Sequence, residues 1–241
     1  TFCLKAMMPK GIRFRSPANV VAEMRHLQDL GIRSVYFQDW EFAANRARAR
    51  EVCRAIAPSP SKLVWGCSCR VADLDDELVA LMVQARCVVV NVGFETGSQR
   101  MLDSVEKRVT IPQVEVGLAA CRKHGLKLRF FGLVNLPGET TESIEESTDF
   151  LAKHGMDVVN PNTPIPYPGT RMHERIGKPL AWDEVEAYSG RVEATLTPEE
   201  ATRTFWRTLR RKRYGRFYPL NPRFLGQVLW PKISRRLAQA V

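Results

Sequence analysis

Three polar stretches each follow a short apolar run, and their residue types suit the binding of a small polar ligand. Acidic groups in residues 38–41 could hold a cation or an amine, or they could cap the following helix. Glu95 lies among the glycines of residues 93–100, which let a ligand approach the backbone, and its carboxylate can accept hydrogen bonds from sugar hydroxyls. Residues 135–140 form a tight turn before a helix whose free amide groups could face a ligand.

Short apolar runs and amphipathic stretches must position these loops. Runs that begin near residues 34, 63, 87, 127 and 157 predict strands, each followed by a helix or a loop. The continuous apolar run at residues 87–90 is typical of a strand covered on both faces. The pattern therefore predicts a parallel sheet, either a curved partial barrel or an open doubly wound sheet. In both, functional residues collect after the carboxyl ends of the strands.

Capping residues mark where several helices begin. Ser16 precedes Pro17 at a helix start, and Thr110 with Gln113 has the spacing of a capping box. The prolines of residues 161–168 predict the end of the sheet, because proline cannot continue a central strand. A last helix, capped at Thr197, is expected to run to about Arg213. We expect a barrel core over residues 1–175 and a basic helical extension over residues 176–241.

Composition limits the class of protein. The 241 residues are 44% hydrophobic, enough for a substantial core without disulfides. An apolar run of about 18 residues and a signal-peptide pattern are both absent from the sequence, so a cytoplasmic protein with reduced thiols is expected. Cys53 and Cys121 fall on apolar helix faces and are interpreted as core thiols. Cys67 and Cys69 share one strand face, where core packing is favoured over contact with substrate or metal.

The net charge of +10 is concentrated at the carboxyl-terminal end. Residues 1–200 hold 25 basic and 26 acidic side chains, whereas residues 201–241 hold eleven Lys or Arg and no Asp or Glu. Aromatic residues alternate with these arginines. Packing on the barrel is the favoured explanation, followed by peripheral contact with an anionic membrane, and then by nucleic-acid binding.

The order of the motifs resembles the radical S-adenosylmethionine superfamily, in particular the branch that carries a cobalamin-binding domain before the radical core. The resemblance covers nearly the whole chain. The motifs that carry it lie at residues 1–3, 15–21, 37–39, 65–70, 93–100, 136–140, 166–170 and 216–218.

This resemblance implies a role for each matching residue. Cys3 becomes the catalytic third ligand of a four-iron four-sulfur cluster, and the other two cysteines are expected three and seven residues before it, upstream of Thr1. Carboxylates and cations are then assigned to the complementary groups of S-adenosylmethionine. The implied positions are Phe2 beside the adenine, Gln38, Asp39 and Glu41 at the amino group, Glu95 at the ribose within a loop that includes Gly93 and Ser98, and Arg70 or Lys107 at the carboxylate.

Two residues depart from the pattern of the branch. Trp40 replaces a second acid, which shifts amine binding to Asp39 and Glu41, and Asn135 replaces a glycine, which puts the local backbone conformation in question. The chain also begins within the cluster loop. We therefore expect a fragment, an α/β partial TIM-like barrel whose first strand is missing, plus the carboxyl-terminal helical extension.

The activity that the resemblance implies is reductive cleavage of S-adenosylmethionine and functionalisation of an unreactive C–H position. Cobalamin-dependent methyl transfer is the favoured outcome, with the cobalamin bound by an upstream domain; radical cyclisation or rearrangement is the alternative. The expected partners are an external electron donor and a small, lipophilic substrate. A non-catalytic S-adenosylmethionine-binding barrel and an iron-free phosphate-binding barrel enzyme are the competing hypotheses.

Overall fold

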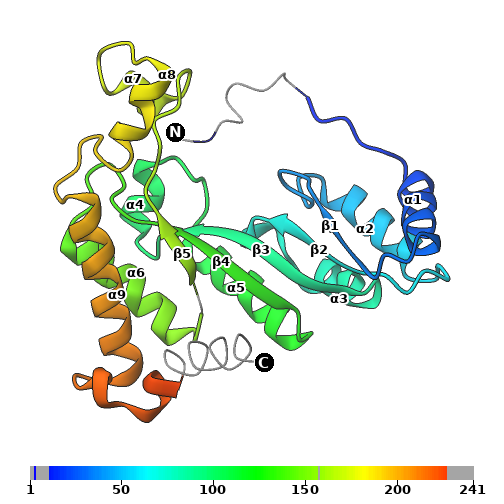
Figure 1. Cartoon of the computed structure of the whole chain (residues 1–241). Coiled ribbons are helices and arrows are strands. Elements are labelled where there is room, and N and C mark those ends of the chain that lie inside the picture. The colour runs from blue at the N-terminus through cyan, green and yellow to red at the C-terminus, as the bar shows by residue number, and fades with distance from the viewer. Residues whose placement is uncertain (1–2, 4–10, 157, 227–241) are drawn as a thin grey trace, which may run out of the picture.

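Five parallel strands form one open sheet in the order β1-β2-β3-β4-β5 (Figure 1). The computed structural model describes Cys3, residues 11–156 and residues 158–226. Because each crossover moves to the next strand in the same direction, the sheet is a segment of a barrel; a doubly wound sheet would reverse its order. The strands are β1 (Ser34–Phe37), β2 (Val64–Cys69), β3 (Cys87–Glu95), β4 (Lys127–Leu133) and β5 (Val158–Asn162).

Helices connect the strands and follow the sheet. The crossovers contain α2 (Arg46–Ile56), α3 (Asp76–Gln84), α4 (Gln99–Ser104), α5 (Ile111–Lys123) and α6 (Thr141–Lys153), while α1 (Pro17–Asp29) precedes β1. After β5 come α7 (Arg171–Glu174), α8 (Trp182–Val185) and α9 (Pro198–Tyr214), and the short turns are η2 (Val71–Asp73), η3 (Glu186–Tyr188) and η4 (Tyr218–Leu220).

The predicted helix starts are confirmed by their side-chain caps. The Ser16 hydroxyl accepts a hydrogen bond from the Asn19 N–H at 3.2 Å. Thr110 and Gln113 form the expected capping box at α5, in which the Thr110 N–H donates to Oε1 of Gln113 at 2.9 Å. Thr197 begins α9 in the same way. Each cap satisfies amide groups that have no partner within the helix itself.

The two faces of the sheet have different chemistry. Side chains on the face toward α2, α3, α5 and α6 are buried, among them Cys67, Val90 and Phe130, which are 0%, 0% and 4% exposed. Strand alternation places Ser68, Asn91 and Arg129 on the opposite face. Figure 1 shows the helices along one side of the strands. The open face therefore carries polar side chains beside apolar ones such as Phe131, which is 36% exposed, and it corresponds to the lumen of a barrel segment.

The carboxyl-terminal extension joins the same core. Ala201, Phe205 and Leu209 of α9 are buried in the hydrophobic cluster of the sheet, and Lys212 pairs with Asp149 of α6. The predicted packing of the basic carboxyl-terminal end on the barrel is therefore confirmed for α9. The sheet itself continues further than expected, because β5 includes Pro161; proline is tolerated there since β5 is an edge strand of the described sheet.

Five of the six cysteines are buried: Cys53, Cys67, Cys69, Cys87 and Cys121. Burial raises the pKa of the Cys53 and Cys121 thiols to about 12. Burial also raises the pKa of Cys67, whose sulfur lies 3.8 Å from that of Cys69. These thiols are core residues, as expected for Cys53 and Cys121. Within the described part of the chain, no helix has the length and apolar character needed to cross a membrane.

Replacement of Gly117 by alanine should destabilise the fold. A Cβ atom at Gly117 would lie 2.0 Å from the carbonyl oxygen of Val71, so α5 and η2 would have to move apart. We expect the free energy of unfolding in urea to fall by about 1–3 kcal/mol, the usual cost of overpacking. Val116→Ala on the exposed side of α5 is the control, with a change within about 0.5 kcal/mol. Equal stability of Gly117→Ala and the parent would contradict the close contact.

Candidate active site

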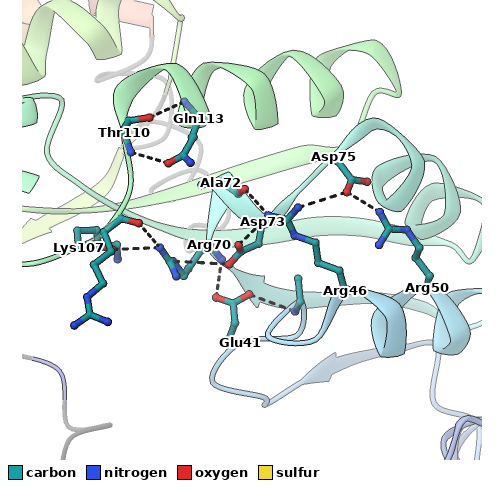
Figure 2. Close-up of polar contacts among 12 residues, drawn as sticks. Glu41, Arg46, Arg50, Arg70, Ala72, Asp73, Asp75, Lys107, Thr110 and Gln113 are labelled. Carbon is teal, nitrogen blue, oxygen red and sulfur yellow. Dashed lines mark hydrogen bonds and ion pairs between the residues drawn. The ribbon is translucent and has the colours of Figure 1, made fainter.

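Four of the residues singled out in the sequence form one chain of contacts at the carboxyl ends of the strands; Figure 2 shows the part of it that involves Glu41, Arg70 and Lys107. Oε2 of Glu41 accepts a hydrogen bond from the Arg70 N–H at 2.7 Å. The Arg70 guanidinium donates to the carbonyl oxygen of Lys107 at 3.2 Å, and the Lys107 ammonium contacts Oε1 of Glu95 at 2.6 Å. The protein itself therefore holds the segments after β1 and β2 together with the end of β3 and the loop between α4 and α5.

Glu95 has an unusual backbone conformation. Its φ is +62°, and the register between β3 and β4 shifts between Gly93 and Glu95. The Thr96 N–H donates to the Phe94 carbonyl at 2.9 Å, which makes Glu95 the centre of a three-residue turn. A left-handed non-glycine residue at a bulge costs of the order of 1–3 kcal/mol, and such strain concentrates at functional sites. The bulge directs the Glu95 carboxylate toward Lys107.

Gly93 makes room for this carboxylate. A Cβ atom at Gly93 would lie 2.7 Å from Oε1 of Glu95 and 3.4 Å from the Lys107 ammonium. Lys107 itself sits between two left-handed residues, Glu106 and Arg108, each with a φ of +53°. The loop between α4 and α5 is thus tightly bent, and the contacts of Arg70 with the Lys107 and Arg108 carbonyls, both at 3.2 Å, hold it.

The predicted amine-binding loop borders a cavity. A cavity of about 880 Å³ lies between β1, α1 and residues 11–15, and Gln38, Asp39, Trp40 and Glu41 contribute to its wall. Gln38 and Asp39 are exposed, whereas Glu41 is partly buried, and burial raises its pKa above the ordinary value. Oε1 of Glu41 also accepts from the Ala43 N–H at 3.3 Å. Glu41 therefore shapes the loop, while Asp39 remains accessible to a ligand.

The loop after Glu95 is anchored to α6. The Ser147 hydroxyl bonds Thr96 Oγ1 at 2.7 Å and accepts from the Gly97 N–H at 3.1 Å. Ser98 follows at the start of α4 and is 1% exposed, and its hydroxyl has no hydrogen-bond partner among the described residues. A buried polar group without a partner is costly, so this hydroxyl is available to a ligand or to water. Sequence reasoning missed Ser147, which lies within a helix.

Asn135 adopts the backbone conformation expected of the glycine that it replaces. Its φ is +61°, the left-handed conformation that a glycine would adopt and that asparagine tolerates better than other residues. Its side-chain amide donates to the Leu196 carbonyl at 2.8 Å and to the Gly190 carbonyl at 2.5 Å. The Asn135 N–H donates to the buried Glu139 carboxylate. Asparagine therefore preserves the turn and also connects β4 to the segment before α9.

A polar row on the open face of the sheet was not singled out in the sequence. The Tyr36 hydroxyl lies 2.8 Å from the Ser68 hydroxyl, and burial raises the pKa of Tyr36. Strand register places Asn91 beside Ser68 on one side and Arg129 on the other. Strand alternation within β2, β3 and β4 was the available signal, but only pairing shows that these residues adjoin.

Cys3 is exposed and is a free thiol, whereas the other five cysteines are buried. It is thus the one of the six thiols that is accessible at the surface. The described residues contain no group of three or more His, Cys, Asp or Glu arranged to hold a metal ion. The described residues can therefore supply one cysteine ligand to a cluster, not a complete set of ligands. Phe2, expected beside the adenine, lies outside the described residues.

The chain belongs to the radical S-adenosylmethionine superfamily: a family model described as "Radical SAM superfamily" matches residues 1–151. It is 29% identical to an uncharacterized methyltransferase of Pyrococcus horikoshii over 72% of this chain and 38% of that protein. It is 26% identical to the anaerobic magnesium-protoporphyrin IX monomethyl ester cyclase of Rubrivivax gelatinosus, over 78% of this chain and 35% of the cyclase. The chain thus spans little more than a third of either relative.

Solved structures agree with the fold. The radical S-adenosylmethionine methyltransferase TsrM from Kitasatospora setae, with tryptophan and an S-adenosylmethionine analogue bound, matches 66% of this chain and 33% of its own, with a TM-score of 0.60 and 26% identity. A TsrM structure with cobalamin and a [4Fe-4S] cluster matches 59% of this chain and 29% of its own, with a TM-score of 0.54 and 28% identity. The partial barrel predicted from the sequence is confirmed.

The accessibility of the six thiols can be measured directly. Cys3 should react rapidly with a thiol reagent in the folded protein, because it is exposed, and the other five should react only after unfolding. The measurement is the number of thiols modified by dithionitrobenzoate with and without guanidinium. A Cys3→Ser variant should lose the rapid phase. Rapid reaction of a second thiol would contradict the burial of the core cysteines.

Glu139 should make stability depend on pH. Burial raises its pKa to about 7 from an ordinary 4.5, so the folded state binds more protons than the unfolded state between these values. The free energy of unfolding should therefore fall as pH rises from 4.5 to 7, by about 3 kcal/mol from this group. Urea unfolding across this range measures it.

Glu139→Gln should remove this part of the pH dependence, because glutamine cannot ionise. Glu146→Gln, an exposed position on α6, should retain it. If the difference in unfolding free energy between the parent and Glu139→Gln is constant from pH 4.5 to 8, the carboxyl group does not titrate as described.

Proposed function

We propose that this chain forms the S-adenosylmethionine-binding core of an enzyme that cleaves the cofactor reductively and functionalises an unreactive C–H position. The supporting observation is the chain of contacts from Glu41 through Arg70 and Lys107 to Glu95, in a member of the radical S-adenosylmethionine superfamily. It brings together carboxylates and cations, the group types that complement the ribose, amino and carboxyl groups of the cofactor.

The Glu95 and Lys107 pair acts as a preformed site. Glu95 and Lys107 are 12% and 21% exposed at their side chains, so each charge is stabilised by the other. Glu95 would accept hydrogen bonds from the ribose hydroxyls of a bound cofactor, and the Lys107 ammonium would then be able to pair with the cofactor carboxylate. Both charges thus have partners before and after binding. Asp39, exposed at the end of β1, receives the amino group.

The proposed iron–sulfur cluster has Cys3 as one of its ligands. A bound four-iron four-sulfur cluster supplies the electron that splits S-adenosylmethionine into methionine and a 5′-deoxyadenosyl radical. The role of this chain is to ligate one iron through the Cys3 thiolate and to orient the cofactor against it. The glycine at position 93 and the bulge at Glu95 hold the nucleoside side of the cofactor.

Methyl transfer assisted by cobalamin is the reaction that we favour. Its support is similarity to a methyltransferase of Pyrococcus horikoshii and to the cobalamin-bound structure of TsrM. The related cyclase from Rubrivivax gelatinosus supports cyclisation as the second candidate. An external electron donor is required in either case, and a cobalamin-binding domain is proposed outside residues 1–241.

Loss of the Cys3 thiol should abolish cofactor cleavage. In the longest natural polypeptide that contains these residues, reconstituted with iron and sulfide without oxygen, Cys3→Ala should form no 5′-deoxyadenosine under dithionite. Cys53→Ala removes a buried thiol on α2 and should leave cleavage largely intact. Chromatography of 5′-deoxyadenosine, with iron content, separates the two. Equal loss in both variants would refute the assignment of Cys3, and a parent that binds the cofactor without cleaving it would favour the binding-barrel hypothesis.

Glu95→Gln should weaken cofactor binding without loss of iron. A charge-assisted hydrogen bond contributes about 1.5–3 kcal/mol, so the Kd for S-adenosylmethionine should rise about 10- to 100-fold. Equilibrium dialysis measures the Kd, and Glu115→Gln at an ion pair on α5 is the control. An unchanged Kd in Glu95→Gln would exclude this carboxylate from the cofactor site.

A further inference from the structure

A groove of about 690 Å³ lies between the end of β5 and α9, on residues that the candidate active site does not use. One wall is Pro161, Asn162 and Thr163. The other is a single side of α9, formed by Pro198, Glu199, Thr202, Arg203, Trp206, Arg207 and Arg210. The groove therefore opens beside the carboxyl end of β5, the same edge of the sheet that carries the other functional loops.

The wall from α9 carries a net positive charge, although Arg203 also interacts electrostatically with Glu200. Arg203 and Arg207 are one helical turn apart, about 6 Å along the axis, and both are exposed. Neither forms an ion pair with a described residue, although Lys212 on the same helix does. Arg210 lies over the rings of Trp206 and Phe224, at 5.5 and 5.6 Å. Glu199 is the acid in this wall, so three guanidinium groups face one carboxylate.

The environment of α9 distinguishes three kinds of anionic partner: a membrane surface, a single-stranded nucleic acid and a small molecule. A helix that enters a membrane surface needs a free apolar face, but Ala201, Phe205 and Leu209 are already buried in the core. Single-stranded nucleic acid needs successive aromatic platforms, whereas the groove has one indole, Trp206, which is half-buried and packed against Arg210. A volume of about 690 Å³ is typical of a site for a small molecule.

We infer that this groove binds the phosphate group of a small organic phosphate. Guanidinium groups bind phosphate oxygens through paired, charge-assisted hydrogen bonds, and Arg203 and Arg207 are placed to do so together. The Asn162 and Thr202 side chains also line the groove and supply further donors. Trp206 provides a flat apolar wall for the organic part. The inference that this phosphate compound is also the substrate of the enzyme rests on the proposed function. The inference that the groove binds phosphate does not rest on it.

The test is isothermal titration calorimetry of the chain with inorganic pyrophosphate at low ionic strength. The double variant Arg203→Gln/Arg207→Gln should bind at least tenfold more weakly than the parent. Arg25→Gln/Arg33→Gln changes the net charge equally at two exposed positions on and after α1 and should bind like the parent. Thermal unfolding confirms that both variants are folded. Added salt should weaken parent binding.

Three results would overturn the inference. The first is equal pyrophosphate affinity in both double variants, or no binding to the parent at millimolar concentration. The second is a twelve-nucleotide oligouridylate that binds the parent far more tightly than pyrophosphate through the same arginines, which would make the ligand single-stranded RNA. The third is arginine-dependent sedimentation with phosphatidylglycerol vesicles in the absence of pyrophosphate binding. Pyrophosphate binding in a polypeptide that forms no 5′-deoxyadenosine would retain the groove and refute the proposed function.

Discussion

The contact between the Arg70 guanidinium and the carbonyl oxygens of Lys107 and Arg108 connects the end of β2 to the loop between α4 and α5. The rest of the candidate site depends on it. It places the Lys107 ammonium against Glu95, whose own backbone is held left-handed by the bulge of β3. A charged pair that is partly removed from water must be well positioned to be stable, so the bent loop and the bulge support each other.

The two faces of the sheet carry different side chains. Strand alternation directs Cys67, Val90 and Phe130 into the helices, where they form the core, and directs Ser68, Asn91 and Arg129 to the open face. The same core contains the five buried thiols, of which Cys53 and Cys121 come from α2 and α5, and burial keeps these two protonated. The exposed thiol of Cys3 is free for chemistry because it is not part of this packing.

The two sides of the last helix, α9, also differ in chemistry. Its apolar side packs with α6, and its arginine side faces the groove beside β5. The basic charge of the carboxyl-terminal end is therefore not a uniform tail. In α9 it is ordered into a stripe by helical periodicity, and it lies next to the edge of the sheet where Asn135 and Glu139 also hold the end of β4.

Local patterns in the sequence determined the strands, the capped helices and the parallel class of the sheet, because periodicity and capping depend on neighbours within a few residues. The motif order also indicated the superfamily. Its assignment of Glu95 to the ribose, and of Arg70 or Lys107 to the carboxylate, stays a prediction. Only the tertiary structure decided that Glu95 and Lys107 pair with each other, that Arg70 holds their loop, and that β5 and α9 enclose a groove. These contacts join residues from separate crossovers, and their geometry follows from sheet register and helix packing, which no short stretch of sequence specifies.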